Sequence, residues 1–335
     1  MMAPGSPPAD RDIDLLVVGE INPDLVISDE DPVPVFGEIE RVVDSIVMTV
    51  GSSSAIVACG AARLGLRVTF FGVVGEDPFG RFMLDAMASR GIDVSACIVD
   101  PARPTGATVI LTSGHDRAML TAMGSIGALD VDEVPPALVA RARHLHTGGF
   151  YLQETSRERL PAFFSAVRAR GVTTSFDTNW DPSEHWDGGV LATLRASDVF
   201  FPNDAEAMRI ARVDDPEAAA RALADAGAEG RTDGGPLVVV KQGAAGAIAC
   251  RAGEAIVRVP AMAVDPVDAT GAGDSFNAGF LRAWLDGEGL QESLELAAAC
   301  GALSTRRAGG VDGQPTFEEA RQAVETWRAA QGRRR

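Results

Sequence analysis

Short apolar segments alternate with helical patterns along most of this chain, and that alternation restricts the fold more than any other feature of the sequence. From Arg143 onward, most apolar runs have the length of one buried strand and are followed by apolar residues at helical spacing. We expect strands at 144–147, 172–177, 198–201, 237–241 and 247–251, and helices at 156–170, 189–196, 204–211, 215–228, 274–286, 290–307 and 316–328. Because strands that alternate with helices form parallel sheets covered on both faces, the sequence predicts a doubly wound, mostly parallel α/β fold.

The N-terminal part of the chain adds a second, smaller unit to this prediction. Apolar runs at 14–19 and 67–74, with helices expected at 53–64 and 79–90, continue the α/β pattern. By contrast, β-type segments in 32–50 and 95–123, with a hairpin tip expected at 114–116, indicate a small separate sheet. We therefore predict a disordered lead-in at 1–12 and one α/β domain at 13–330 that includes this sheet.

The charge of the chain argues against nucleic acid as a partner. It has 30 basic and 47 acidic residues and a net charge of −17, whereas nucleic-acid binding requires Lys and Arg to displace counterions. Lys241 is the only lysine, so the Gly-Lys pair of a Walker P-loop is absent and that route to nucleotide binding is excluded.

No segment of the sequence predicts secretion, a membrane span or a zinc site. The first 14 residues lack the apolar core of a signal peptide. No apolar run approaches the roughly 18 residues that a membrane span needs. The four cysteines are scattered and form no zinc-binding pair. We expect a cytoplasmic protein without a membrane partner.

The most informative motif is a glycine-rich turn at 268–279 that leads into a helix. Free backbone amides at Gly271, Ala272 and Gly273, with the positive end of the helix dipole behind them, would form an anion site. Asp274, in the first turn, should stay ionised and could take a proton from a hydroxyl that attacks a bound phosphate. On spacing alone, Asp274 could equally well cap a helix after a flexible turn.

Two further motifs follow predicted strands. Asn203 and Glu206, three residues apart at a helix start, form the pattern of a capping box, which we favour over a magnesium-orienting pair. Lys241 ends a strand, and Gly243 and Gly246 follow it in a turn. This turn is either a plain hairpin or a place where the backbone approaches a nucleotide.

Three polar loops also follow predicted strands and suit the recognition of hydroxyl groups. They contain Asn22 and Asp24, Gly51 and Ser52, and Asn179. Ordinary turn chemistry would explain the same residues. Since ligands of open α/β sheets bind outside the carboxyl ends of the strands, we expect these loops to lie near one another.

Taken together, these motifs resemble the ribokinase-like (PfkB) family of carbohydrate and nucleoside kinases over about residues 14–315. The segment 268–279 is similar to the C-terminal signature of the family, and 51–80 to its N-terminal signature. The Asn203-x-x-Glu206 pattern matches the magnesium and phosphate motif in order and place.

The resemblance implies ATP-dependent phosphorylation of a hydroxymethyl group on a small sugar, with the small sheet as a lid. Asp274 would be the general base, and Gly271, Ala272 and Gly273 would stabilise the transferring phosphate. The residues that would place Mg²⁺ and the nucleotide are Asn203, Glu206, Lys241, Gly243 and Gly246. Those that would bind the sugar are Asn22, Asp24, Gly51, Ser52 and Asn179, and those that would bind a monovalent cation such as K⁺ are Asp268 and Thr270. Related kinases also form dimers through the lid, so a homodimer is expected.

The sequence departs from the pattern of the family at two positions. Ile56 stands where most relatives have an Asn, so recognition of one sugar hydroxyl should be weaker or different. Trp180 stands where relatives that take anionic substrates often have Arg, which favours a neutral ligand stacked on the ring.

Three other functions remain as alternatives at this stage. They are a nucleoside kinase, a non-catalytic sugar-sensing relative and a dinucleotide-dependent dehydrogenase. The intact Asp274 and its glycines argue against the sensor. The dehydrogenase lacks a G-x-G-x-x-G motif after a strand, because Phe276 stands where the third glycine would be.

Overall fold

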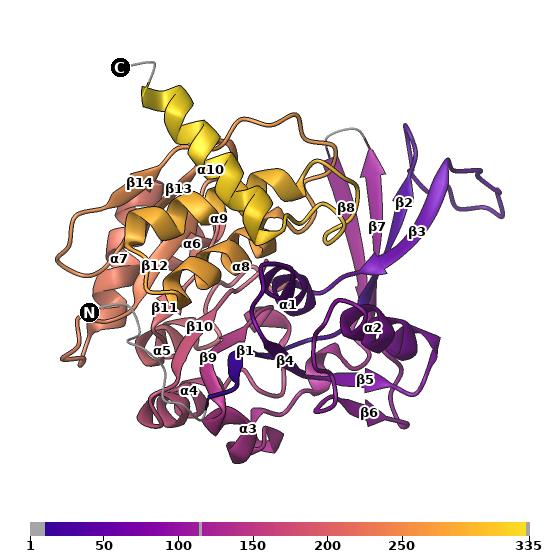
Figure 1. Ribbon diagram of the computed structural model, residues 1–335. Coiled ribbons are helices and arrows are strands. Elements are labelled where there is room, and N and C mark those ends of the chain that lie inside the picture. Colours follow the sequence, from indigo (N-terminus) through magenta and orange to yellow (C-terminus); the bar gives the residue numbers. More distant parts are fainter. Residues whose placement is uncertain (1–10, 114–115, 333–335) are drawn as a thin grey trace.

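A sheet of eight strands runs through the computed structural model, which describes residues 11–113 and 116–332 (Figure 1). In spatial order the strands are β14 (Val257–Val259), β13 (Ala247–Cys250), β12 (Leu237–Lys241), β11 (Val199–Phe200), β10 (Thr173–Phe176), β9 (Ala142–Thr147), β1 (Ile13–Val18) and β4 (Val68–Phe71). The pairs from β12 to β4 are parallel, and β13 and β14 are antiparallel additions at one edge. This confirms the predicted doubly wound, mostly parallel fold.

Helices cover both faces of this sheet, and alternate residues of β1 point to each side. Leu15 and Val17 belong to the core under α1 (Ser53–Arg63), α2 (Pro78–Ala88), α8 (Ala272–Leu285), α9 (Leu290–Ser304) and α10 (Phe317–Gly332). Leu16 and Val18 belong to the opposite core, under α3 (Pro136–Ala140), α4 (Leu160–Ala169), α5 (Val190–Ala196), α6 (Asp204–Ala211) and α7 (Pro216–Ala228). Burial on both faces explains why β1 is apolar throughout.

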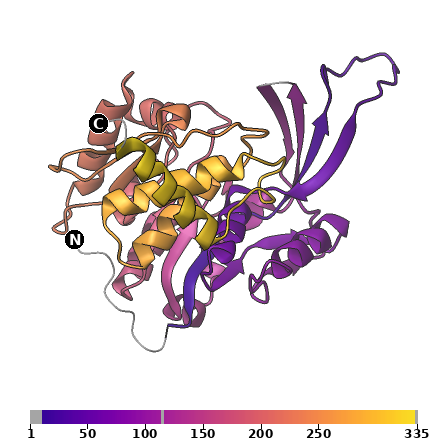
Figure 2. The same ribbon diagram turned by 45° about the horizontal axis from the view of Figure 1, so that its top comes forward.

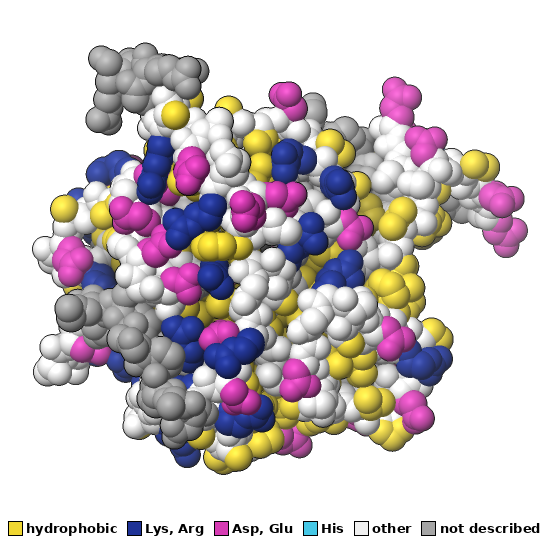
Figure 3. Space-filling view, in the orientation of Figure 1, with side chains coloured by type: hydrophobic (Ala, Val, Ile, Leu, Met, Phe, Trp, Pro, Cys, Tyr) yellow, Lys and Arg dark blue, Asp and Glu magenta, His cyan; other side chains and the backbone are white. Residues whose placement is uncertain are grey.

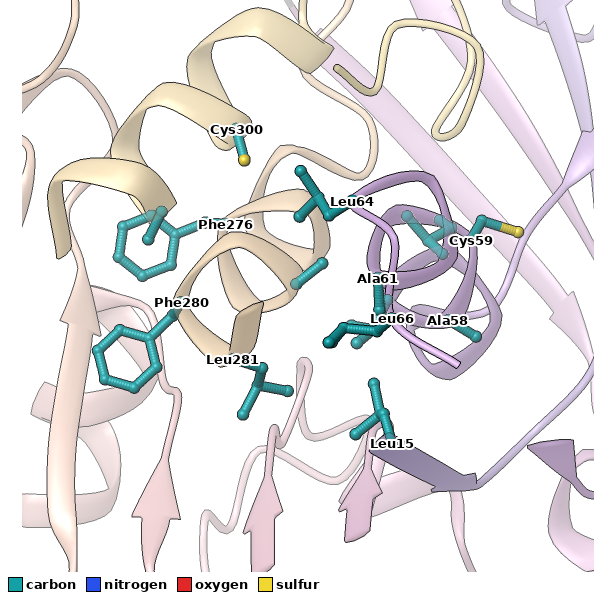
Figure 4. Packing of buried hydrophobic residues seen from close by; sticks show 14 of the residues in the cluster. Leu15, Ala58, Cys59, Ala61, Leu64, Leu66, Phe276, Phe280, Leu281 and Cys300 are labelled. Carbon is teal, nitrogen blue, oxygen red and sulfur yellow. The ribbon is translucent and has the colours of Figure 1, made fainter. Parts of the chain in front are cut away.

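Helix α8 is packed tightly between α1 and α9. A Cβ atom at Gly60 of α1 would lie 2.9 Å from the Cβ of Ala278, and one at Gly279 would lie 2.8 Å from the Sγ of Cys300 on α9. Figure 4 shows Phe276 and Phe280 of α8 in the same apolar layer as Leu64 of α1. Small residues at these contacts therefore allow α8 to pack closely against both neighbouring helices.

The lid is a second sheet that projects from the body (Figures 1 and 2). Its strands in spatial order are β3 (Ser45–Val50), β2 (Pro23–Ser28), β7 (Ala107–Ser113) and β8 (Asp116–Ala122). Strands β7 and β8 form an antiparallel hairpin; residues 114–115 of its expected tip lie outside the described residues. The sequence therefore placed β3, β7 and β8 in this sheet but missed β2, whose first residue is a proline.

Residues 98–100 differ from the predicted lid. They form β6 (Ile98–Asp100), which pairs with β5 (Val73–Gly75) in a separate two-stranded sheet. The apolar run 67–74 supplies both β4 and β5, because Gly72 interrupts it: a Cβ there would lie 2.5 Å from the carbonyl oxygen of Gly19. The chain therefore leaves the main sheet at Gly72, where its backbone packs against Gly19, and continues as β5 in the two-stranded sheet.

Two residues of the predicted lead-in contact the body. Arg11 donates hydrogen bonds to the carbonyl oxygens of Arg170 and Gly171, and Asp12 forms an ion pair with Arg141. Residues 1–10 lie outside the described residues. Within 11–113 and 116–332, no helix has both the length and the apolar character to cross a membrane.

The packing of α8 predicts a large stability effect at Leu281, which is fully buried in the core shared with α1. Leu281→Ala should lower the free energy of unfolding by about 2–5 kcal/mol, because it removes apolar contacts and leaves a cavity. Leu281→Met, which nearly preserves the volume, should cost less than about 1.5 kcal/mol. Equal losses for the two variants in urea unfolding would contradict this account.

Candidate active site

The predicted site residues come together at the carboxyl ends of the parallel strands. Asp177 follows β10, Asn203 follows β11 and Lys241 ends β12, while Glu20 follows β1 on the far side of β9. The N-terminus of α8 lies over the same edge, since Asp274, Asp177 and Lys241 influence one another electrostatically. This is where ligands of open α/β sheets bind.

The residues of the predicted anion site lie at the start of α8. Gly271 has φ of 69°, and a Cβ atom there would lie 2.7 Å from the carbonyl oxygen of Gly310, so only glycine fits. The amide of Ala272 donates to the carbonyl oxygen of Ala269 and is already used. In the described part of the chain, no protein acceptor bonds to the amides of Gly271 and Gly273. The anion site is therefore narrower than the three amides expected.

Asp274 lies in the first turn of α8 and is partly accessible to solvent. Burial, followed by the nearby negative charge of Asp177, raises the pKa of its carboxyl group to about 7. Its Oδ1 atom accepts a hydrogen bond of 2.5 Å from the hydroxyl of Ser53, which favours the ionised form. A carboxylate with a pKa near neutrality is well suited to general-base catalysis.

A buried ion pair lies beside this carboxylate. The Nζ atom of Lys241 is 2.5 Å from Oδ2 of Asp177, and the side-chain amide of Asn277 on α8 donates to the same oxygen at 2.7 Å. Burial opposes both charges, but their attraction outweighs it, lowering the pKa of Asp177 and raising that of Lys241. A Cβ placed on Gly273 would be 3.6 Å from Nζ. Lys241 therefore brings its positive charge to the amides of the anion site.

Asn203 and Glu206 form the expected capping box at the start of α6. The side chain of Asn203 accepts from the amide of Glu206 at 2.8 Å, and the carboxylate of Glu206 accepts from the amide of Asn203 at 2.9 Å. Burial and the charge of Asp177 raise the pKa of Glu206 to about 7. The predicted capping box is confirmed. Glu206 is also close enough to Asp177 and Lys241 for their charges to influence its pKa.

The predicted sugar-binding residues divide into two groups. Asp24 and Asn22 are buried at the start of β2, where the amide of Asn22 lies 3.5 Å from an oxygen of Asp24. A Cβ on Gly51 would lie 2.1 Å from the same oxygen. By contrast, the hydroxyl of Ser52 caps α1, accepting from the amide of Ala55 and donating to the carbonyl oxygen of Glu20. The hydroxyl of Ser52 therefore has a structural role, and substrate binding by this residue stays a prediction.

Asn179 lies in the loop after β10, as does Trp180, whereas Ile56 lies on α1. The amide of Asn179 donates to Asp177, and its φ of 54° turns the chain there. Trp180 packs edge-to-face on Trp186 and lies under the guanidinium group of Arg209, so protein groups already contact the ring that was expected to stack on a ligand. Ile56 is buried behind Gly271 and Gly310.

Asp268 joins the glycine-rich turn to the segment after α9. Its two carboxylate oxygens accept hydrogen bonds of 2.8 Å from the amides of Thr270 and Gly309. Burial disfavours the charge, but these amides outweigh it and lower the pKa of Asp268. The hydroxyl of Thr270 accepts from Arg117 of the lid strand β8 at 3.3 Å. The residues expected at a monovalent-cation site thus lie together, beneath the lid.

The turn that contains Gly243 and Gly246 borders a groove. Gly246 has φ of 101°, and a Cβ there would collide with Val259 and Pro260. Pro260 also lines a groove of about 910 Å³ between the segment 260–264 and α10, where Trp327 forms part of the wall. Gly243, with φ of 52°, has open space where its Cβ would be.

Four residues at this site were not selected from the sequence, namely Ser53, Asp177, Arg117 and Asn277. Asp177 lies two residues before Asn179 in the same predicted polar loop, and its place directly after a buried strand was the available signal. Ser53 and Arg117 come from distant parts of the chain, and no local pattern places them beside the glycine-rich turn. Asn277 lies three residues after Asp274 on α8, so helical spacing was the available signal for it.

An α/β fold with a lid, backbone amides without acceptors at the start of α8 and a carboxylate beside them are the features of a phosphotransferase that acts on an alcohol group. The model of the pfkB family carbohydrate kinases matches residues 12–316, and the chain belongs to this family. A fructokinase from Klebsiella pneumoniae is 32% identical over 290 residues, which cover 82% of this chain and 91% of that protein. Similar proteins also include 2-dehydro-3-deoxygluconokinases.

Solved structures agree with this assignment. A fructokinase double mutant from Vibrio cholerae O395, with fructose, ADP and potassium ion bound, has a TM-score of 0.76 at 25% identity, covering 96% of this chain and 99% of that chain. An E. coli structure assigned as ribokinase II, in complex with ATP and Mg²⁺, has a TM-score of 0.78 at 24% identity over 94% of this chain and 99% of that chain. The predicted ribokinase-like fold and the carbohydrate kinase assignment are confirmed.

The contact between Ser53 and Asp274 predicts a shift in the pH dependence of turnover. A general base must be ionised to accept a proton, so with Asp274 in the predicted role of base the rate should rise with pH through its pKa of about 7. Ser53→Ala removes a hydrogen bond that favours the ionised form, so the acidic limb of the rate profile should move to higher pH. Ser53→Thr keeps a hydroxyl and should leave the limb in place. A limb that stays at the wild-type pH in Ser53→Ala would refute this role.

Proposed function

We propose that this chain transfers the γ-phosphate of ATP to a hydroxymethyl group of a small, neutral sugar. The observation that carries the proposal is the start of α8, where Asp274 lies beside the unbonded amides of Gly271 and Gly273 and close to the ammonium group of Lys241. Phosphoryl transfer needs mainly positioning and charge stabilisation, and these groups supply both.

Asp274 would accept the proton of the acceptor hydroxyl as its oxygen attacks the phosphorus. The bond from phosphorus to the leaving oxygen of ADP then breaks, and the phosphoryl group passes to the sugar. The amides of Gly271 and Gly273, together with Lys241, would stabilise the negative charge that spreads over the transferring group. Closure of the lid would exclude water, which would otherwise compete as the acceptor.

The acidic and polar groups at this edge fit a magnesium ion that arrives with the nucleotide. Within 11–113 and 116–332, no group of three or more His, Cys, Asp or Glu side chains could hold a metal by itself. Mg²⁺ usually keeps several waters and binds through one or two carboxylates plus substrate phosphates. Glu206 would orient such waters, with Asn203 fixing its position. When bound, Mg²⁺ would neutralise phosphate charge.

The nucleoside part of ATP would lie along Gly243, Gly246 and the adjoining groove. No protein atom lies within 4 Å of the position that a Cβ on Gly243 would take, and the groove offers apolar surface around Trp327.

Asp268 and Thr270, with the carbonyl groups near Gly309, would hold a potassium ion behind the anion site. Because Asp268 is ionised and partly buried, a cation there would offset its charge.

A neutral sugar fits the charges that face the predicted acceptor site. Asp24 and Asn22 offer acceptors and donors for hydroxyl groups, and the lack of a side chain at Gly51 lets the carboxylate of Asp24 lie against the backbone there. Burial raises the pKa values of Asp24 and Asp274 to about 7, so these groups would repel a carboxylate only where they are ionised, whereas Arg117 on the lid would attract one. An ADP-release assay over neutral sugars, acidic sugars, sugar phosphates and nucleosides, with and without potassium, tests both the substrate class and the cation. Turnover restricted to nucleosides would overturn the proposal.

The proposed base gives a direct prediction. Asp274→Asn should remain folded and bind ATP, but its turnover should fall by a factor of about 10² or more, because the group that accepts the proton is lost. Turnover is measured by ADP release and ATP binding by calorimetry. Asp286→Asn makes the same substitution at the exposed C-terminal end of α8, far from the proposed base, and should keep most of the turnover. Wild-type turnover in Asp274→Asn would remove Asp274 from the mechanism.

The lid also supports a homodimer. One face of its sheet carries Asp24, Thr108 and Thr121, which belong to the site side. The register of the strands places Ile46, Met48, Leu120 and their paired neighbours Leu25, Ile27, Val109 and Leu111 on the opposite face. Ile46 and Leu120 are 64% and 65% exposed, and Figure 3 shows hydrophobic side chains on the projecting lid. A second copy of the same apolar face would cover this surface.

Charge on the outer face of the lid should therefore break the dimer. Ile46→Glu combined with Leu120→Glu should convert the protein from dimer to monomer in light scattering after gel filtration, because carboxylates would be buried in an apolar interface. Val99→Glu adds a charge on β6, outside the lid sheet, and should leave the dimer intact. A monomeric wild-type protein would refute the proposal.

A further inference from the structure

A second pocket, of about 380 Å³, lies beside the segment that follows α9. Arg63, the last residue of α1, forms one wall, and Arg306 and Arg307, just after α9, form another. Asp312, Gln314 and Glu319 complete the polar lining. None of these residues belongs to the predicted phosphoryl-transfer site, so that site does not account for the pocket.

The charges in this pocket are unbalanced in favour of the arginines. Asp312 forms an ion pair of 3.1 Å with Arg90, so its charge is already compensated. Throughout 11–113 and 116–332, Arg63, Arg306 and Arg307 form no ion pair within 4.0 Å. Glu319, whose carboxylate accepts from the amide of Thr316 at 2.7 Å, is then the single carboxylate facing three guanidinium groups. This excess is unusual in a chain whose net charge is −17.

Two of the arginines are held so that their terminal groups remain available to a ligand. The Nε atom of Arg63 donates to the carbonyl oxygen of Gln314 at 2.6 Å, and that of Arg306 donates to Leu303 at 3.3 Å. Neither residue uses its Nη atoms for a hydrogen bond within the described protein, and Arg307 makes no side-chain hydrogen bond there. A guanidinium group anchored through Nε presents its remaining donors as a planar fork, which matches a tetrahedral oxyanion.

We propose that this pocket is a binding site for a small phosphate-bearing anion. Three guanidinium groups from two elements can surround one phosphate, and charge-assisted bonds of this kind are stronger than neutral ones. The volume leaves room for a small body attached to the phosphate. In Figure 3, Lys and Arg side chains gather on the face near α1 and the segment between α9 and α10.

The segment that lines this pocket also supports the start of α8. Gln314, whose carbonyl oxygen holds Arg63, donates from its side chain to Ser275 of α8 at 3.1 Å and to the carbonyl oxygen of Ile56 at 2.9 Å. Gly309 in the same segment donates to Asp268. An anion that draws Arg63 and Arg307 together would therefore hold the segment 305–314 more rigidly. Binding itself does not rest on the proposed kinase reaction.

Hydrogen exchange measured by mass spectrometry tests the site, with inorganic phosphate as the probe. Phosphate should slow exchange of amides in 305–314 of the wild-type protein. In Arg63→Gln combined with Arg307→Gln, that slowing should disappear and the apparent phosphate affinity for this segment should fall by about tenfold or more, because charged hydrogen bonds are lost. Any slowing at 271–275, where phosphate would enter the active site, should be the same in both proteins.

Controls separate this site from unspecific charge effects. Arg81→Gln removes an exposed arginine on α2 and should behave like the wild type. Arg307→Gln alone removes no hydrogen bond of the described protein, so it tests binding without affecting the anchor of Arg63. Succinate should protect 305–314 less than phosphate at equal concentration. Absence of protection in the wild type, equal protection in the double variant, equal loss in Arg81→Gln or equal protection by succinate would each overturn the proposal.

Discussion

The site depends on where α8 begins, and a contact between two glycine backbones fixes that point. Gly271 adopts a left-handed conformation and approaches the carbonyl oxygen of Gly310 too closely for any side chain. Asp268 links the glycine-rich turn to the segment after α9, because its carboxylate accepts hydrogen bonds from the amides of Thr270 and Gly309. Behind this contact, Ile56 of α1 fills the apolar space. The helix therefore starts with free amides above the sheet, and Asp274 is carried to the same place.

The electrostatics of the site follow from this placement. Asp177 and Glu206 are buried, Asp274 is partly buried beside them, and one ammonium group, that of Lys241, lies among them. Asp177 takes the lysine as its partner and remains ionised, while the pKa values of Asp274 and Glu206 rise to about 7. Neighbouring carboxylates thus differ in proton affinity, and such differences are what allow one group to act as a base while another holds a cation.

The lid joins the acceptor side of the site to an exposed apolar surface. Strand β2 carries Asp24 on one face and Leu25 on the other, because side chains alternate along a strand. Arg117 of β8 reaches Thr270 in the glycine-rich turn. The same small sheet would therefore contact substrate, approach the anion site and present its outer face to a second chain. Because the lid projects from the body, one face of its sheet can turn toward the site while the other stays exposed (Figure 2).

The sequence by itself determined the fold class and the position of the glycine-rich turn that opens α8. Alternating strand and helix patterns depend on local spacing. The glycines and the aspartate of the turn are adjacent in the sequence from Gly271 to Asp274, so this motif can also be found locally. The capping box at Asn203 was predictable for the same reason. Only the tertiary structure decided that Ser53 bonds to Asp274 across 221 positions, that Asp177 pairs with Lys241, and that the hydroxyl of Ser52 serves the scaffold. These contacts join distant segments, so their partners are set by helix and strand packing rather than by any local pattern.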